Sequence, residues 1–243
     1  MEFSEDDAAA VYDVTNPWRA EPGTSDGFYT EHATAARSVL DVGCGTGQML
    51  HSLRAQGHHG RLTGIDPDAA ALRRARRRAD VEWVEGPAAD IPWRAEFALA
   101  TMANNAFQCL VTDADIAASL TAIRAALIDG GQFVFETRHP QARAWEVWAA
   151  AEPAPFEYAG RQLVSWWEVE SADDGVVTFT ETVGEPDRTP LRTDRATLRF
   201  LDVDPLNAAL RRAGFAVEHQ YGDFRGGPIT ADSGSIVTVA RAA

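Results

Sequence analysis

The stretch VLDVGCGTGQ, residues 39–48, decides the fold of this chain of 243 residues. The residues before its glycines predict a short buried strand, and those after them begin a helical pattern. Between the two, Gly43, Gly45 and Gly47 permit a backbone with positive φ and let a ligand approach main-chain atoms closely. A helix that starts here offers free N–H groups and a positive dipole. The stretch therefore predicts a turn that binds a small ligand, with the Asp41 carboxylate close to it.

The spacing of the glycines distinguishes between known ligand-binding turns. A dinucleotide-binding turn has the pattern Gly-x-Gly-x-x-Gly, whereas the glycines here alternate. A phosphate-binding P-loop carries Lys and then Ser or Thr after its last glycine, and this chain has Gln48 there. Residues 41–47, DVGCGTG, instead resemble motif I of the class I methyltransferases that use S-adenosylmethionine (SAM). An ordinary tight turn between a strand and a helix is the alternative.

The resemblance implies SAM as the cofactor and gives individual acids a role. Asp66 closes the predicted strand 61–66 and matches the acid that accepts hydrogen bonds from both ribose hydroxyls; the alternative is an Asp that only caps a helix. Asp90 matches the acid that binds the adenine amino group, although a surface turn also fits. The implied cofactor-binding residues are Asp41, Gly43, Cys44, Gly45, Gly47, Asp66, Pro67, Ala89, Asp90, Ile91 and Asn104.

The remaining pattern fits the fold of this family, an α/β fold with a seven-stranded, mostly parallel, doubly wound sheet. Two last strands are expected to form an antiparallel closing hairpin, and an antiparallel β cap is expected as an insertion. Gly130 and Gly131 are expected to end the helix that begins at Asp113. The strands of the main sheet are predicted at 39–42, 61–66, 81–85, 97–102, 132–137, 215–221 and 235–241.

We expect a single structural domain that is built from three parts. Residues 1–36 form an N-terminal arm, which either closes over the cofactor as a lid or lies on the surface, held by its aromatic residues. Residues 37–140 and 202–243 form the SAM-binding core. Residues 141–201 contain a helix and antiparallel strands, and the resemblance implies that they form the substrate cap.

Substrate-binding candidates are aromatic or polar residues near the predicted site. The two tryptophans among them are three residues apart on one helix face, so core packing is their alternative role. The candidates are Tyr12, Trp18, Tyr29, Asn105, Phe107, Arg138, Trp145 and Trp148.

His139 follows the fifth strand, at the edge of the sheet where open α/β sheets bind ligands. It is the candidate general base that would deprotonate an acceptor hydroxyl or ammonium group. A hydrogen-bonded structural histidine is the alternative. If the acceptor is a neutral amine, proximity to the methyl group suffices and no base is needed.

Charge favours a small-molecule substrate over a nucleic acid. The net charge of −14 repels polyanions at long range. The arginine-rich run 73–78 is expected to be a solvated helix end rather than a nucleic-acid patch. All 22 basic residues are arginine, which excludes Schiff-base chemistry and lysine-dependent phosphate loops.

The remaining composition bounds the class of protein. Hydrophobic content of 45% and charged content of 24% are those of a globular domain. Two cysteines give no disulfide framework, and we expect no metal site. Short apolar runs and an acidic N-terminus predict neither a membrane span nor a signal peptide, so we expect a cytoplasmic monomer or homodimer.

The sequence therefore predicts a SAM-dependent methyltransferase that modifies an N or O atom of a small molecule. Specialised metabolism is the expected setting of this reaction. A SAM-binding protein that catalyses another reaction or uses SAM structurally is the alternative. An RNA or protein methyltransferase is disfavoured because Asn105-Ala106-Phe107 lacks the prolines of the Asn/Asp-Pro-Pro-aromatic motif. A nicotinamide dehydrogenase fails on glycine spacing.

Overall fold

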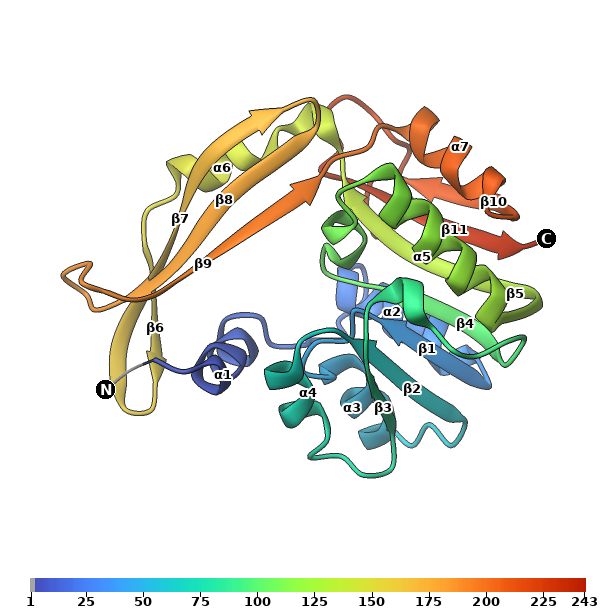
Figure 1. Cartoon of the computed structure of the whole chain (residues 1–243), viewed down its shortest axis with the longest axis horizontal. Coiled ribbons are helices and arrows are strands. Elements are labelled where there is room, and N and C mark those ends of the chain that lie inside the picture. Colours follow the sequence, from blue (N-terminus) through green and yellow to red (C-terminus); the bar gives the residue numbers. More distant parts are fainter. Residues whose placement is uncertain (1–2) are drawn as a thin grey trace.

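The computed structural model describes residues 3–243, and within them the strands form two sheets (Figure 1). The larger sheet has seven strands in the order β10-β11-β5-β4-β1-β2-β3. Its neighbours pair in parallel from β3 to β5, whereas β11 runs antiparallel to both β5 and β10. The strands are β1 Ser38–Val42, β2 Arg61–Asp66, β3 Glu82–Glu85, β4 Phe97–Met102, β5 Leu127–Arg138, β10 Phe215–Tyr221 and β11 Ser235–Ala242.

Both faces of this sheet are covered because its central strands are apolar on both sides. All five residues of β1 are buried, as expected of a parallel strand between two helical layers. Successive side chains point to opposite faces: Val39 packs with one helical layer, and Leu40 packs with the other. The first layer contains α2 Ser25–Ala35 and α3 Gln48–Ala55, and the second contains α5 Asp113–Ala126 and α7 Val203–Arg212.

The expected helix end at Gly130 and Gly131 is wrong. Helix α5 already ends at Ala126, and the next residue, Leu127, has extended backbone. The two glycines lie within β5, at a break in its pairing with β4, where Gly130 has φ of +74°. The glycine thus permits a left-handed residue in an irregular strand rather than a helix cap.

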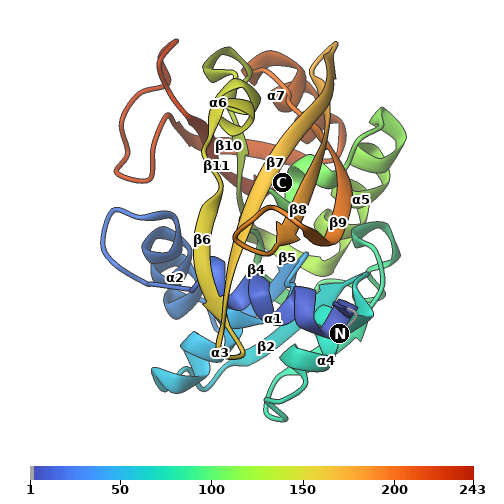
Figure 2. The same cartoon turned by 90° about the vertical axis from the view of Figure 1, so that its left-hand side faces the viewer.

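The second sheet is an antiparallel meander inserted between β5 and α7 (Figure 2). Helix α6 Ala144–Ala150 packs against it through Trp145 and Trp148, which contact Phe200 and Phe179. These contacts match the alternative of core packing for the two tryptophans. The four strands are β6 Ala154–Tyr158, β7 Arg161–Asp173, β8 Val176–Gly184 and β9 Pro190–Arg199.

Helix α1, Glu5–Thr15, lies between the inserted sheet and the core, beside β6 and α4 Ala69–Ala75 (Figures 1 and 2). Its start is fixed by a capping box between Ser4 and Asp7. Short 3₁₀ turns complete the fold at η1 Ala88–Asp90, η2 Ala106–Cys109 and η3 Pro140–Ala142. The predicted fold class is confirmed, whereas the division into arm, core and cap stays a prediction.

Candidate active site

The glycine loop has the backbone that its sequence predicts. Gly43, Gly45 and Gly47 have φ of +73°, +53° and +78°, all in the left-handed region that favours glycine. A Cβ at Gly47 would lie 2.4 Å from the Trp83 ring, so packing also requires glycine there. A Cβ at Gly45 would meet nothing within 4 Å. This part of the loop therefore presents bare main chain to open space, as close ligand approach requires.

Asp66 connects this loop to the next helix. Its carboxylate accepts a hydrogen bond from the Gly45 N–H at 2.8 Å and another from the Asp68 N–H at 2.8 Å. Burial raises the pKa of Asp66, and these two hydrogen bonds oppose the rise. A carboxylate has about four acceptor sites, so two bonds leave capacity for the hydroxyl groups of a ligand.

Asp41 is the buried acid at the end of β1. Its carboxylate accepts a hydrogen bond from the Thr101 hydroxyl at 2.9 Å. Burial raises the pKa of Asp41 to about 7, the Thr101 bond opposes this rise, and the nearby Asp66 charge adds to it. At neutral pH the loop thus has a poorly solvated acid beneath it.

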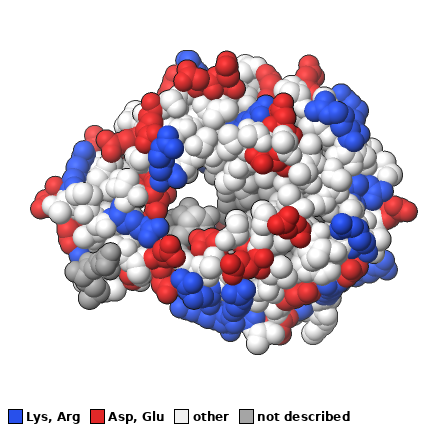
Figure 3. Space-filling model, in the orientation of Figure 1, with Lys and Arg blue, Asp and Glu red and all other residues white. Residues whose placement is uncertain are grey.

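A cavity of about 930 Å³ opens above the glycine loop. Figure 3 shows the surface hollowed between the inserted sheet and the core, with acidic side chains on the rim. The lining comes from α1, the glycine loop, the starts of the segments after β2, β3 and β4, and the inserted sheet. The inserted sheet contributes Glu181, Val183, Arg192 and Asp194.

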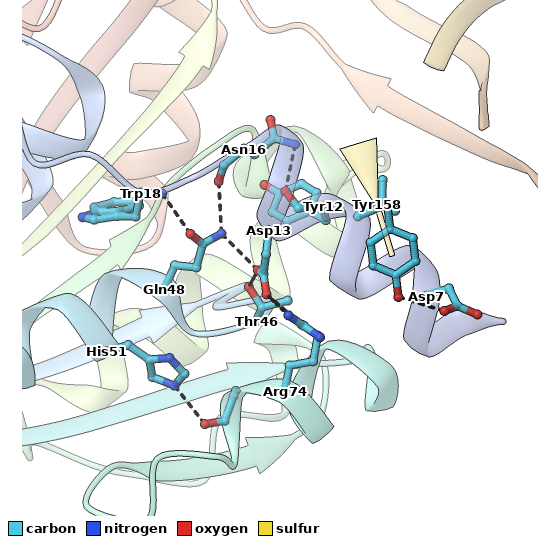
Figure 4. Close-up of polar contacts among 12 residues, drawn as sticks. Asp7, Tyr12, Asp13, Asn16, Trp18, Thr46, Gln48, His51, Arg74 and Tyr158 are labelled. Atoms are coloured by element: carbon cyan, nitrogen blue, oxygen red, sulfur yellow. Dashed lines mark hydrogen bonds and ion pairs between the residues drawn. The ribbon is translucent and has the colours of Figure 1, made fainter. Parts of the chain in front are cut away.

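The Asp13 side chain binds α1 to the glycine loop (Figure 4). It accepts hydrogen bonds from the Thr46 hydroxyl and from Gln48 Nε2, and it forms an ion pair with Arg74 at 2.6 Å. Hydrogen bonds to charged groups contribute about 1.5–3 kcal/mol each. Because an isolated helix of this length is marginal in water, these bonds stabilise the docked position of α1.

Two further contacts hold the segment around α1. Gln48 also donates to the Asn16 carbonyl at 3.0 Å and accepts from the Trp18 N–H at 2.9 Å (Figure 4). At the other end of the helix, the Tyr158 hydroxyl of β6 donates to Asp7 at 2.8 Å. Helix α1 therefore bridges the cofactor loop and the inserted sheet.

The arginine run begins in the last turn of α4, as expected of a helix end, and two of its members have a further role there. Arg74 pairs with Asp13, and Arg73 pairs with Asp6 at 2.8 Å, so both hold α1. The run neutralises acids of a neighbouring helix, which the sequence order alone does not show.

Nine of the predicted site residues line the cavity together. They are Tyr12, Trp18, Asp41, Gly43, Cys44, Gly45, Asp66, Pro67 and Asn104. Gly47 lies just behind the lining, as the N-cap of α3. The roles of these residues stay predictions, but the structure brings their side chains or backbone to one place.

The segment after β3, which was predicted to bind adenine, lines the cavity only with its first residues. Gly86, Pro87 and Ala88 line the cavity, whereas Ala89 and Asp90 are exposed outside it. Ile91 is buried in the core below α5. The adenine contacts of Ala89, Asp90 and Ile91 therefore stay predictions that this arrangement does not support.

Three predicted substrate residues lie behind the cavity lining, two of them in the core and the third half-buried in a turn. Tyr29 is fully buried, and its hydroxyl donates to the Met102 carbonyl at 3.3 Å. Phe107 is buried and stacks on Phe135 with 4.6 Å between ring centroids. Asn105 takes a left-handed conformation before η2 and does not line the cavity. Each of these residues supports the lining from behind.

His139 and Arg138 lie at the end of β5, outside the cavity lining. His139 is 3% exposed, and its Nδ1 has no hydrogen-bond partner among the described residues. Arg138 lies over the Trp148 ring at 5.3 Å. This burial does not support His139 as a general base, and that role stays a prediction.

Sequence reasoning missed Asp13, Thr46 and the cavity face of the inserted sheet. Glu136, a buried acid three residues before His139, lies close to the turn at the end of β4: burial raises the pKa of Glu136 to about 7, and the backbone of Asn105 and Asn104 opposes the rise. Neither contact has a motif in the sequence.

Within residues 3–243 no three His, Cys, Asp or Glu side chains are grouped to hold a metal ion. Over the same range no helix combines the length and the apolar character that a bilayer crossing requires.

Residues 39–131 match the family model described as a methyltransferase domain. The chain is 32% identical over 115 residues to 2-phytyl-1,4-naphtoquinone methyltransferase of Thermosynechococcus vestitus, a match that covers 45% of this chain and 50% of that protein. It is 27% identical over 217 residues to cypemycin N-terminal methyltransferase of a Streptomyces species, with 84% and 82% covered. The chain thus spans half of the first relative and most of the second.

Two solved structures share the fold over nearly the whole chain. The CcbJ methyltransferase of Streptomyces caelestis aligns with a TM-score of 0.76 at 22% identity, covering 98% of this chain and 97% of that one. SAM-bound CalS10, an amino pentose methyltransferase of Micromonospora echinaspora, aligns with a TM-score of 0.67 at 22% identity, covering 99% and 92%. These structures confirm the fold, and the match to the methyltransferase domain model confirms the predicted methyltransferase class, whose cofactor is SAM.

Replacing Asp13 with Ala should weaken SAM binding through α1. The loss of the Thr46, Gln48 and Arg74 contacts frees the helix, and we expect the dissociation constant for SAM to rise roughly 10-fold. Isothermal titration calorimetry measures this change. The matched control is Asp6→Ala, which breaks the exposed pair between α1 and Arg73 but touches no loop residue. Equal SAM affinities of the two variants would contradict the role of Asp13 in holding α1 beside the SAM site.

Asp41→Asn should flatten the pH dependence of stability. Because the pKa of Asp41 rises from 3.8 unfolded to about 7 folded, the folded state keeps a proton that the unfolded state has released. The free energy of unfolding therefore falls as pH rises between these values, and the deficit persists above them. In the SAM-free variant, Tm should fall less between about pH 5 and pH 8 than in wild type. Parallel Tm curves for the two proteins would contradict this assignment.

Proposed function

Because the chain carries a class I SAM-dependent methyltransferase domain, we propose that it methylates the nitrogen of a small-molecule amine. The observation that supports this proposal best is the charge of the cavity lining. One arginine, Arg192, lines it, and this arginine is paired with Asp194 at 2.6 Å. The acids in the lining are Glu5, Asp41, Asp66, Asp68, Glu181 and Asp194. Such a cavity attracts cations and repels anionic acceptors.

SAM supplies the methyl group as an electrophile bound to a positively charged sulfur. The chain has to hold the acceptor in line with this group and keep water away, which lowers the barrier by orientation. We assign the cofactor side to the glycine loop and Asp66. Helix α1 and the inserted sheet form the facing wall, so the acceptor lies between this wall and the loop.

The names of several relatives support nitrogen as the acceptor atom. The cypemycin enzyme is an N-terminal methyltransferase, CalS10 acts on an amino pentose, and KedS8 of a Streptoalloteichus species is a sugar N-methyltransferase. The name of the naphthoquinone relative, which aligns over half its length, does not mention an amine. A role in specialised metabolism belongs to the same proposal.

The predicted cytoplasmic location and monomeric or homodimeric state remain parts of the proposal, as does the absence of a nucleic-acid substrate. The net charge of −14 supports the last of these.

Asp66→Ala should abolish measurable SAM binding, since two ribose hydrogen bonds to a charged acceptor are lost and the Gly45 N–H loses its partner. The expected weakening is about 100-fold or more. Calorimetry gives the affinity, and circular dichroism and Tm of the SAM-free variant show whether the fold persists. A folded Asp66→Ala protein with wild-type affinity for SAM would contradict the assignment of Asp66 to cofactor binding.

An amine panel tests the proposed acceptor. Wild-type protein and SAM are incubated with a free-amine peptide, a nucleotide-linked amino sugar and benzylamine, each beside its hydroxyl analogue. We expect S-adenosylhomocysteine and a product heavier by one methylene group with at least one amine, and none with its hydroxyl partner. Mass spectrometry detects both. Methylation of the hydroxyl compounds alone would overturn the proposal.

A further inference from the structure

Glu181 is the acid of the inserted sheet that faces the cavity without an arginine partner. It lies on β8, opposite Trp167 of β7 and Asp194 of β9. Residues directly opposite in antiparallel strands share one face, and Glu181 and Asp194 both line the cavity. Asp194 is neutralised by Arg192. Among residues 3–243, Glu181 forms no ion pair.

The surroundings of Glu181 make its charge available to a ligand. Glu181 is exposed in the cavity wall; partial desolvation there raises the pKa of Glu181, a hydrogen bond with the Trp167 side chain opposes the rise, and Asp194 adds to it. Tyr12 is 43% exposed; partial desolvation raises the pKa of Tyr12 to about 12, and the charges of Glu181 and Asp66 add to the rise. Tyr12 therefore lies within the electrostatic range of both the inserted sheet and the cofactor acid.

The acids on the opposite wall have protein donors already. Asp66 accepts two backbone hydrogen bonds, Asp41 accepts one from Thr101, and Asp68 caps α4 by accepting from the Ala70 and Ala71 N–H groups. These acids serve the loop and the cofactor. On the inserted sheet, Glu181 has the Trp167 side chain as a donor but no ion pair among residues 3–243, and it lines the cavity where an acceptor has to lie.

We propose that Glu181 binds the ammonium group of the acceptor and takes the proton that this group must lose, an inference that rests on the proposed function. The ammonium group forms a charged hydrogen bond with the carboxylate, which is stronger than a neutral one. The Tyr12 ring and hydroxyl border the same space.

The reaction balances with these groups alone. The acceptor R–NH₃⁺ gives one proton to the Glu181 carboxylate and becomes R–NH₂. Its nitrogen lone pair then forms the bond to the methyl carbon while the electron pair of the carbon–sulfur bond returns to sulfur. The products are R–NH₂⁺–CH₃, S-adenosylhomocysteine and protonated Glu181, which releases its proton to solvent.

Glu181→Gln tests this role with Glu168→Gln as the matched control. Glu168 is exposed on β7, next to Trp167, and does not line the cavity, so its variant makes the same charge change on the same sheet. With the best amine of the panel, Glu181→Gln should raise KM about 10- to 100-fold and lower kcat, since a charged hydrogen bond is lost. Its SAM affinity and the kinetics of Glu168→Gln should stay within about 2-fold of wild type.

A second measurement does not depend on turnover. Sinefungin is a SAM analogue in which an amine-bearing carbon replaces the methylated sulfur, so it carries an ammonium group toward the acceptor space. Wild type should prefer sinefungin to S-adenosylhomocysteine by calorimetry, and Glu181→Gln should lose most of this preference while Glu168→Gln keeps it.

The outcomes separate the two proposals. If wild type methylates only hydroxyl compounds, the proposed function fails. If wild type methylates an amine and Glu181→Gln keeps the wild-type KM and kcat, the role of Glu181 fails alone. If no panel compound is methylated, an unchanged sinefungin preference in Glu181→Gln overturns the role of Glu181, and a lost preference supports it.

Discussion

The site depends on one arrangement: β1 and β2 end side by side, with a glycine loop after the first and a buried carboxylate after the second. The Gly45 N–H donates to Asp66 and joins the two ends. Left-handed backbone costs residues other than glycine roughly 1–2 kcal/mol per position, so three alternating glycines avoid a substantial strain. Packing adds a second reason at Gly47, against the Trp83 ring. At Gly45 the open space beyond the main chain is itself the requirement, because a ligand has to approach there.

This loop is also the anchor for the facing wall of the cavity. The Asp13 carboxylate accepts hydrogen bonds from a hydroxyl, an amide and a guanidinium group. Two of these donors, Thr46 and Gln48, flank the last glycine of the loop. Because Asp7 of the same helix binds Tyr158 of β6, α1 connects the loop to the inserted sheet by direct contacts on both sides.

The local signals in the sequence were sufficient for the core and for the position of the glycine loop and the two acids beside it. Glycine spacing, acids at strand ends and apolar runs depend on neighbouring residues, and they predicted β1, β2, Asp41 and Asp66 correctly in position. The contact of Asp13 with Thr46 joins residues 33 positions apart, and the cavity face of β8 depends on how the insertion folds back. Alternation shows that Glu181 and Thr182 point to opposite faces, but it does not show which face meets the cofactor. The glycine pair at 130–131 was misleading because a helix cap and a strand irregularity need the same positive φ.

The division of acids between the two walls fits the direction in which charge moves. Methyl transfer to an amine takes positive charge from sulfur and leaves it on nitrogen, so the stabilising field has to be stronger on the acceptor side as the reaction proceeds. Acids that already accept protein hydrogen bonds hold the cofactor wall rigid, and their charge is partly compensated. The Glu181 carboxylate on the inserted sheet holds the ammonium acceptor and takes up its proton, and the remaining acids of the lining face the positive charge as it moves to nitrogen. A hydroxyl acceptor that lost its proton would carry a negative charge that the same acids repel, and for this reason the charge of the cavity bears on the acceptor atom more directly than the shape of the fold does.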